Sequence, residues 1–158
     1  MADGPANDAA HRLIDDVEFG DDVVVFSFTN LYGCRIGDRT RIGPFVEIQR
    51  GAVVGAGCKI QSHTFICDGV TIEDDVFVGH GVMFVNDNRP HAAGEWECLP
   101  TVVERGASIG SGAVILGGLR IGAGALVGAG AVVTREVARG ETVAGVPAQA
   151  TRPRAGSE

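Results

Sequence analysis

Residues 69–84, GVTIEDDVFVGHGVMF, place a large apolar side chain at every sixth position. These side chains are Ile72, Val78 and Phe84, and a valine stands two positions before each one. A period of six matches neither the 3.6-residue period of an α-helix nor the alternation of a two-faced strand. It is typical of a solenoid in which every hexad supplies one short strand and one turn.

The same period runs through most of the chain. Its large positions are Ile36, Ile42, Ile48, Val54, Ile60, Ile66, Ile72, Val78 and Phe84, then Val103, Ile109, Ile115, Ile121, Val127 and Val133. A small or β-branched residue follows each of them by four positions, except after Phe84, where the repeat is interrupted, and with only Leu119 oversized. Three hexads (3 × 6 = 18 residues) predict a three-sided coil, and successive coils rise by about 4.8 Å. Each coil then buries its apolar side chains only by stacking on its neighbours.

The composition agrees with a single β-rich domain. The chain has 158 residues, 24 of them glycine, and aromatics make up only 6%. A net charge of −7 disfavours a general nucleic-acid or anionic-membrane surface. No apolar run approaches ~20 residues and the N-terminal stretch lacks a signal-peptide core, so we expect a cytoplasmic protein. No Cys-x-x-Cys pair is present; Cys34 and Cys58 occupy small core positions, whereas Cys98 falls outside the repeat.

This hexad pattern resembles the hexapeptide-repeat family of acyltransferases. The resemblance implies an all-β fold, a left-handed parallel β-helix over residues 19–150. Residues 1–18 are expected to form an arm or cap, and residues 151–158 a tail. The general rule for parallel crossovers would favour the right hand, so the left hand comes from the resemblance alone.

The repeat is interrupted at about residues 85–102. This interval contains Pro90, Gly94 and Pro100 and keeps no six-residue apolar pattern, so it should leave the β-helix as an external loop. Loops on rigid scaffolds often carry function. An exposed indole is costly, so we expect Trp96 to pack against something, such as a neighbouring subunit.

The predicted coil also determines vertical neighbours. His80 should lie one coil above Ser62, and His63 one coil below Gly81. Asn86, one strand further round, should lie above Asp68. In a trimer of such prisms, the corner with His80 can face the loop with Asn86 across an interface.

The interrupting segment is similar to that of acetyl-CoA-dependent N-acetyltransferases acting on nucleotide-linked 3-amino sugars. The similar elements are Phe84-x-Asn86-Asp87-x-x-Pro90, and Trp96 followed by Pro100 and Thr101, although Glu97, Cys98 and Leu99 make this return one residue longer. The resemblance implies a homotrimer with sites between subunits and acetyl-CoA as co-substrate. No metal is expected.

The C-terminal block resembles the half of hexapeptide acetyltransferases that binds coenzyme A. Ser111 and Ala129, 18 positions apart, match positions beside the pantetheine, and Thr134, Arg135 and Arg152 match positions near the adenosine phosphates. Small corner residues let a linear cofactor approach the backbone, and guanidinium suits phosphate. No P-loop or G-x-G-x-x-G is present.

The chemistry that the resemblance implies is direct attack of an amine on a thioester. A histidine, with an unperturbed pKa of about 6.5, can accept the proton. His80 is the candidate base, oriented by Asp87 of a neighbouring chain, while Asn86 holds the amine or the carbonyl. The candidate acceptor-binding residues are His63, Arg89, Trp96 and Glu97.

Three alternatives remain open from sequence: a hexapeptide O-acetyltransferase, a zinc γ-type carbonic anhydrase and a non-catalytic β-helix scaffold. Many hexapeptide O-acetyltransferases place a histidine before the loop proline, where this chain has Arg89, and the similar N-acetyltransferases often have proline at the position of His80. A γ-type carbonic anhydrase needs three converging histidines, of which only His63 and His80 are at hand. A scaffold that has lost its site would not bind coenzyme A.

Overall fold

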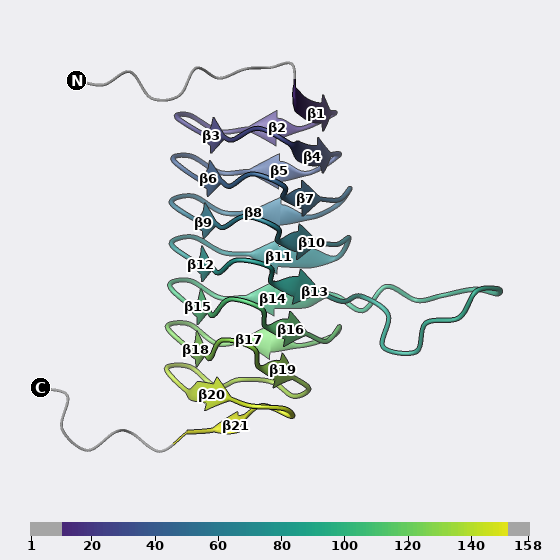
Figure 1. Ribbon diagram of the computed structural model, residues 1–158, viewed down its shortest axis with the longest axis vertical. Helices are drawn as coiled ribbons and strands as arrows, with labels where there is room; N and C mark the ends of the chain where they lie inside the picture. The colour runs from purple at the N-terminus through teal and green to yellow at the C-terminus, as the bar shows by residue number, and fades with distance from the viewer. Residues whose placement is uncertain (1–10, 152–158) are drawn as a thin grey trace, which may run out of the picture.

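The computed structural model describes residues 11–151, which form a left-handed parallel β-helix of three sheets (Figure 1). Sheet A contains β1 (Arg12–Asp15), β4 (Thr29–Tyr32), β7 (Glu47–Ile48), β10 (Phe65–Ile66), β13 (Met83–Phe84), β16 (Val114–Ile115) and β19 (Val132–Val133). Sheet B contains β2 (Glu18–Phe19), β5 (Arg35–Ile36), β8 (Val53–Val54), β11 (Val70–Ile72), β14 (Thr101–Val103) and β17 (Arg120–Ile121). Sheet C contains β3 (Val24–Val25), β6 (Arg41–Ile42), β9 (Lys59–Ile60), β12 (Phe77–Val78), β15 (Ser108–Ile109), β18 (Leu126–Val127), β20 (Thr142–Ala144) and β21 (Gln149–Ala150).

The hexads build the core as predicted. Every large position from Ile36 to Val133 is buried, and so are the small positions that follow, except for the partly buried Leu119. Threonines at small positions satisfy their hydroxyls inside the wall, since Thr64 Oγ1 donates to the carbonyl of Gly79 at 2.9 Å. Cys34 and Cys58 are buried core residues, as the sequence indicates.

The 18-residue register holds in the middle of the molecule and changes at both ends. Lys59 pairs with Phe77, and Phe65 with Met83, each 18 positions on. The first coil is shorter, because Arg12 pairs with Thr29 (29 − 12 = 17), and the last is shorter still, because Leu126 pairs with Thr142 (142 − 126 = 16). Strand β1 thus joins sheet A ahead of residue 19, where the β-helix was expected to begin.

The interruption leaves the prism as an external loop between β13 and β14 (Figure 1). Across it, Met83 pairs with Val114, which is 31 positions on (114 − 83 = 31), so the coil closes normally around the inserted residues. At the C-terminal end, β21 pairs antiparallel with β20. Residues 11–151 include no helix long and apolar enough to cross a membrane.

Candidate functional site

One corner of the prism, between sheets C and A, carries the predicted base. We call the two-residue turns along this edge the His80 corner. They are Ser27–Phe28, Pro44–Phe45, Ser62–His63, His80–Gly81, Ser111–Gly112 and Ala129–Gly130. Their first residues form one column and their second residues another.

In the first column, His80 is held between two serines. Its Nδ1 lies 2.8 Å from Ser62 Oγ on the coil below, and its backbone N–H donates to Ser111 Oγ at 3.1 Å on the coil above. The predicted stacking of His80 over Ser62 is therefore confirmed. The His80 side chain is exposed, and Nε2 has no hydrogen-bond partner within residues 11–151. One ring nitrogen is thus fixed and the other is available to a ligand.

The second column changes character at His80. Below it, the rings of Phe28, Phe45 and His63 stack with centroid separations of 5.1 and 4.9 Å, all three at positive φ. Level with it and above, the second residue of each turn is Gly81, Gly112 or Gly130, and a Cβ added there would meet nothing within 4 Å. A strip of backbone without side chains therefore begins beside His80 and runs toward the C-terminal end. Another corner has a similar open strip, at Gly106, Gly124 and Gly140, but no histidine stands next to it.

The predicted cofactor residues divide between two corners. Ser111 and Ala129 stack along the His80 corner, where the backbone N–H of Gly130 donates to the Ser111 carbonyl at 2.9 Å. Thr134 and Arg135 follow β19 at a different corner, between sheets A and B. The Arg135 guanidinium is already paired with Glu141 at 3.0 Å. Arg152 lies outside the described residues.

The base of the external loop is attached to the prism by amide side chains. Asn86 Nδ2 donates to the Asp68 carbonyl at 3.0 Å, as the 18-residue spacing predicts. Asn88 binds Gly117 twice: its Nδ2 donates to the carbonyl at 3.0 Å, and its Oδ1 accepts from the backbone N–H at 2.8 Å. Asn88 was missed from sequence, although its position between Asp87 and Arg89 in the loop motif was a usable signal.

Most of the remaining loop residues are solvent-exposed. Asp87 Oδ1 accepts the backbone N–H of Arg89 at 2.8 Å, which fixes a local turn. Arg89, Trp96 and Glu97 are exposed, Trp96 by 56%. The loop leaves from the corner between sheets A and B, so a single chain does not bring Asn86 or Asp87 to His80. Of the acceptor-binding candidates, only His63 shares the corner with His80.

The loop thiol is not activated. Partial burial and the negative charge of Asp68 raise the pKa of Cys98, and its Sγ lies 3.5 Å from the Asp68 carbonyl. A raised pKa leaves little thiolate at neutral pH, which disfavours a nucleophilic role. Within residues 11–151, no three His, Cys, Asp or Glu side chains gather as a metal site would require.

Comparisons with known proteins agree with this architecture. Residues 33–68 and 100–135 match the family model described as bacterial transferase hexapeptide (six repeats). A hexapeptide-repeat-containing acetyltransferase from Vibrio cholerae O1 biovar eltor, crystallised with acetyl coenzyme A, is 30% identical, with a TM-score of 0.69, over 76% of this chain and 70% of that one. The chain therefore belongs to the hexapeptide-repeat acetyltransferase family.

Three further proteins place limits on the comparison. A mutant of AntD, an N-acyltransferase from Bacillus cereus solved with dTDP and coenzyme A, shares the fold at a TM-score of 0.78 with 18% identity, covering 85% of this chain and 82% of that one. A serine acetyltransferase from Buchnera aphidicola is 38% identical over 66% of this chain and 37% of its own length. A bifunctional protein GlmU from Heliobacterium modesticaldum is 33% identical over 82% of this chain and 27% of its own. The chain thus spans well under half the length of these two curated relatives.

Proposed function

We propose that this chain transfers an acetyl group from acetyl-CoA to the amine of a nucleotide-linked amino sugar. The observation that carries the proposal is the position of His80, whose ring is anchored by Ser62 at the start of a backbone strip free of side chains. The resemblance of the loop motif to N-acetyltransferases of nucleotide-linked sugars supports the choice of acceptor.

The proposed reaction is a direct displacement. The acceptor nitrogen attacks the thioester carbon, a C–N bond forms, the C–S bond breaks and coenzyme A leaves as a thiolate, which then takes from His80 the proton that the nitrogen gave up. His80 Nε2 accepts the proton that the nitrogen loses; in this proposal Nδ1 carries the ring hydrogen and donates it to Ser62 Oγ, which leaves Nε2 with a free lone pair. A backbone N–H of the corner or the Asn86 amide stabilises the negative charge on the carbonyl oxygen.

The open strip fits a linear thioester cofactor. At Gly81, Gly112 and Gly130 no side chain fills the second turn position, and the space next to the backbone is empty. An extended pantetheine can therefore lie against the corner and exchange hydrogen bonds with main-chain groups. The cofactor supplies the activated acetyl group and a thiol leaving group.

A trimer would complete the site in this proposal. Exposed apolar side chains flank the His80 corner, with Met83 on sheet A at 42%, and Phe77 at 39% and Leu126 at 46% on sheet C. Large apolar residues exposed together typically mark protein interfaces. Packing such a corner against a second subunit would bring that subunit's loop, with Asn86, Asp87, Arg89, Trp96 and Glu97, to His80.

The test is an assay of thiol release from acetyl-CoA with UDP- and dTDP-linked amino sugars as acceptors. We expect turnover with amines and none with the matching hydroxyl sugars, and we expect acetyl-CoA to raise the Tm by linkage. His80→Ala should lose turnover at neutral pH. Asp21→Ala is the matched control, since Asp21 is the first residue of a turn at another corner.

Each contrary result has a distinct meaning. A protein that acetyl-CoA does not stabilise and that turns over no amine would be a non-catalytic scaffold. Preference for a hydroxyl acceptor would make it an O-acetyltransferase. Full turnover by His80→Ala would show that His80 is not the base, and the proposed acetyl transfer would still stand.

A further inference from the structure

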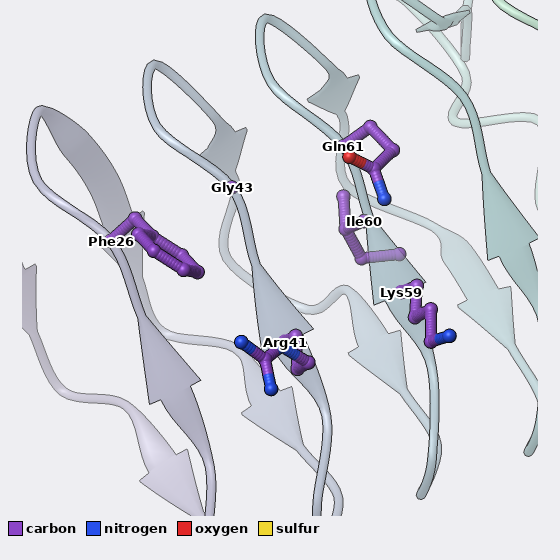
Figure 2. Close-up of a pocket in the computed structure, with 6 residues that line it drawn as sticks. All are labelled: Phe26, Arg41, Gly43, Lys59, Ile60 and Gln61. Carbon is purple, nitrogen blue, oxygen red and sulfur yellow. The ribbon is translucent and has the colours of Figure 1, made fainter. Parts of the chain in front are cut away.

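A pocket lies on the outer face of sheet C, next to the His80 corner but nearer the N-terminal end. It has a volume of about 380 Å³ and is lined by Phe26, Arg41, Gly43, Lys59, Ile60 and Gln61 (Figure 2). Each of these residues lies on β6 or β9, or shortly after β3, β6 or β9. Three successive coils therefore form one wall of the pocket.

The two cations of this pocket lie side by side, and no carboxylate of residues 11–151 forms an ion pair with either of them. Arg41 and Lys59 are register partners in the parallel pair β6–β9. Like charges directly opposite each other on a sheet destabilise it. Their own register neighbours on the outer strands are uncharged, because Val24 pairs with Arg41 and Phe77 pairs with Lys59.

Six other arginines of the described chain are paired with carboxylates. Arg12, Arg89 and Arg139 are not, but none of these three is the register partner of a second cation. Arg35, Arg39, Arg50, Arg105, Arg120 and Arg135 each lie within 4.0 Å of a carboxylate. Arg41 and Lys59 make no ion pair within residues 11–151, in a chain whose net charge is −7 and whose only lysine is Lys59. An adjacent, unneutralised pair in so acidic a protein is the arrangement expected where an anion binds.

The surroundings suit a diphosphate in particular. A guanidinium presents several N–H groups in a fork that matches phosphate oxygens, and an ammonium adds a compact charge beside it. The Arg41 guanidinium lies 6.0 Å from the centre of the Phe26 ring, which holds it against the wall. Gly43, which also lines the pocket, has no room for a side chain, because a Cβ there would lie 2.8 Å from the backbone N of Ser62 on the next coil.

The pocket is connected to the candidate catalytic group. Gln61, at its edge, directly precedes Ser62, which anchors His80. Lys59 lies one coil below Phe77, and Phe77 stands three residues before His80 in the chain. At about 3.3 Å per residue along the strand and about 4.8 Å between coils, the Cα atoms of Lys59 and His80 are about 11 Å apart. A sugar with its diphosphate can bridge this span.

We infer that Arg41, Lys59 and Gln61 bind the diphosphate of a nucleoside-diphosphate-linked acceptor and so place its sugar at the His80 corner. This inference rests on the proposed function for its ligand source. The adenosine phosphates of coenzyme A offer the same chemistry, so the experiment must separate the two.

The test compares binding of UDP, dTDP and adenosine 3′,5′-bisphosphate by isothermal titration calorimetry to the wild type and to the double variant R41Q/K59Q. We expect the double variant to weaken UDP or dTDP at least tenfold and to leave the bisphosphate unchanged. Arg35→Gln, which breaks an exposed ion pair on sheet B, is the control and should change neither. Because the positive charges of Arg41 and Lys59 repel each other when no anion is bound, the unliganded double variant should have a Tm equal to or above that of the wild type.

A second readout uses the single lysine. UDP or dTDP should protect Lys59 from an amine-reactive label, measured by peptide mass spectrometry. Two results for the double variant would overturn the inference. One is unchanged affinity for UDP and dTDP, and the other is lost affinity for the bisphosphate while UDP and dTDP still bind. These binding measurements need no turnover, so protected Lys59 in a protein without acetyl transfer would refute the proposed function and leave the pocket assigned.

Discussion

His80 and Ser62 are far apart in the chain and in contact across one coil step. The contact of 2.8 Å fixes which ring nitrogen faces outward, so Ser62 acts in our proposal as a positioning residue. We expect Ser62→Ala to lower kcat by roughly twofold to tenfold, the effect of about 0.5–1.5 kcal/mol from one hydrogen bond. The KM for acetyl-CoA should stay constant.

Steady-state kinetics in both substrates provide this measurement. Ser62→Thr keeps the hydroxyl and should recover most of the rate. A Thr variant as slow as the Ala variant would show that the hydroxyl is not what positions the ring.

The four thiols provide a second prediction at this scale. Burial raises the pKa of Cys34 and Cys67 to about 11, and it also raises that of Cys58. Cys98 is less buried, and its pKa is raised as well. Raised values mean less thiolate at neutral pH, so we expect iodoacetamide at pH 7.5 to modify only Cys98, and slowly, with a rate that rises with pH.

Intact-mass spectrometry over time follows this labelling. All four thiols should react once the chain is unfolded in denaturant. Fast labelling of Cys98 at neutral pH would mean that the loop leaves Asp68 in solution.

Among the elements, the external loop depends on Asn88 for its attachment. Asn88→Ala removes two hydrogen bonds and leaves the buried N–H of Gly117 without its partner, a loss of about 1–3 kcal/mol. We expect faster cleavage by a Glu-specific protease after Glu95 and Glu97, and a lower Tm. Asn30→Ala is the control, because the Asn30 side chain makes no hydrogen bond within residues 11–151.

The core elements were predictable from sequence because each hexad sets its own inward residues. The position of His80 over Ser62 followed from the same 18-residue arithmetic. The contact of Asn88 with Gly117 did not, since it depends on how the loop lies over the following coil. The stack of Phe28, Phe45 and His63 was also missed, because these outward turn residues lie outside the apolar period.

The shorter first and last coils were missed for a related reason. A repeat shortened to five or four residues keeps its inward side chains but loses turn residues. Counting the apolar residues alone therefore does not reveal the shortening. The pocket with Arg41 and Lys59 likewise needs the register of two coils before the unpaired charges become visible.

At the scale of the whole molecule, the apolar residues beside the His80 corner predict self-association. A trimer would have three times the chain mass of 16.3 kDa. We expect Leu126→Glu to convert it to a monomer and to abolish turnover, since charge at a buried contact is costly. Light scattering after gel filtration measures the mass, and circular dichroism checks the fold.

Val53→Glu is the matched control for this prediction, because Val53 faces outward on sheet B, away from the corner. It should leave mass and turnover unchanged. A Leu126→Glu protein with unaltered mass and full activity would place the interface elsewhere.

The stacked coils also make spacing along the prism a stepwise quantity. Eighteen residues of uncharged hexads inserted between Gln61 and Ser62 would keep Ser62 directly beneath His80 while moving Arg41 and Lys59 one layer, about 4.8 Å, further away. The fold should tolerate the added layer, because each layer packs only on its neighbours. Acceptor length would then be selected by the number of layers, so chains of this architecture can acquire a preference for longer acceptors without any change to the residues that perform the chemistry.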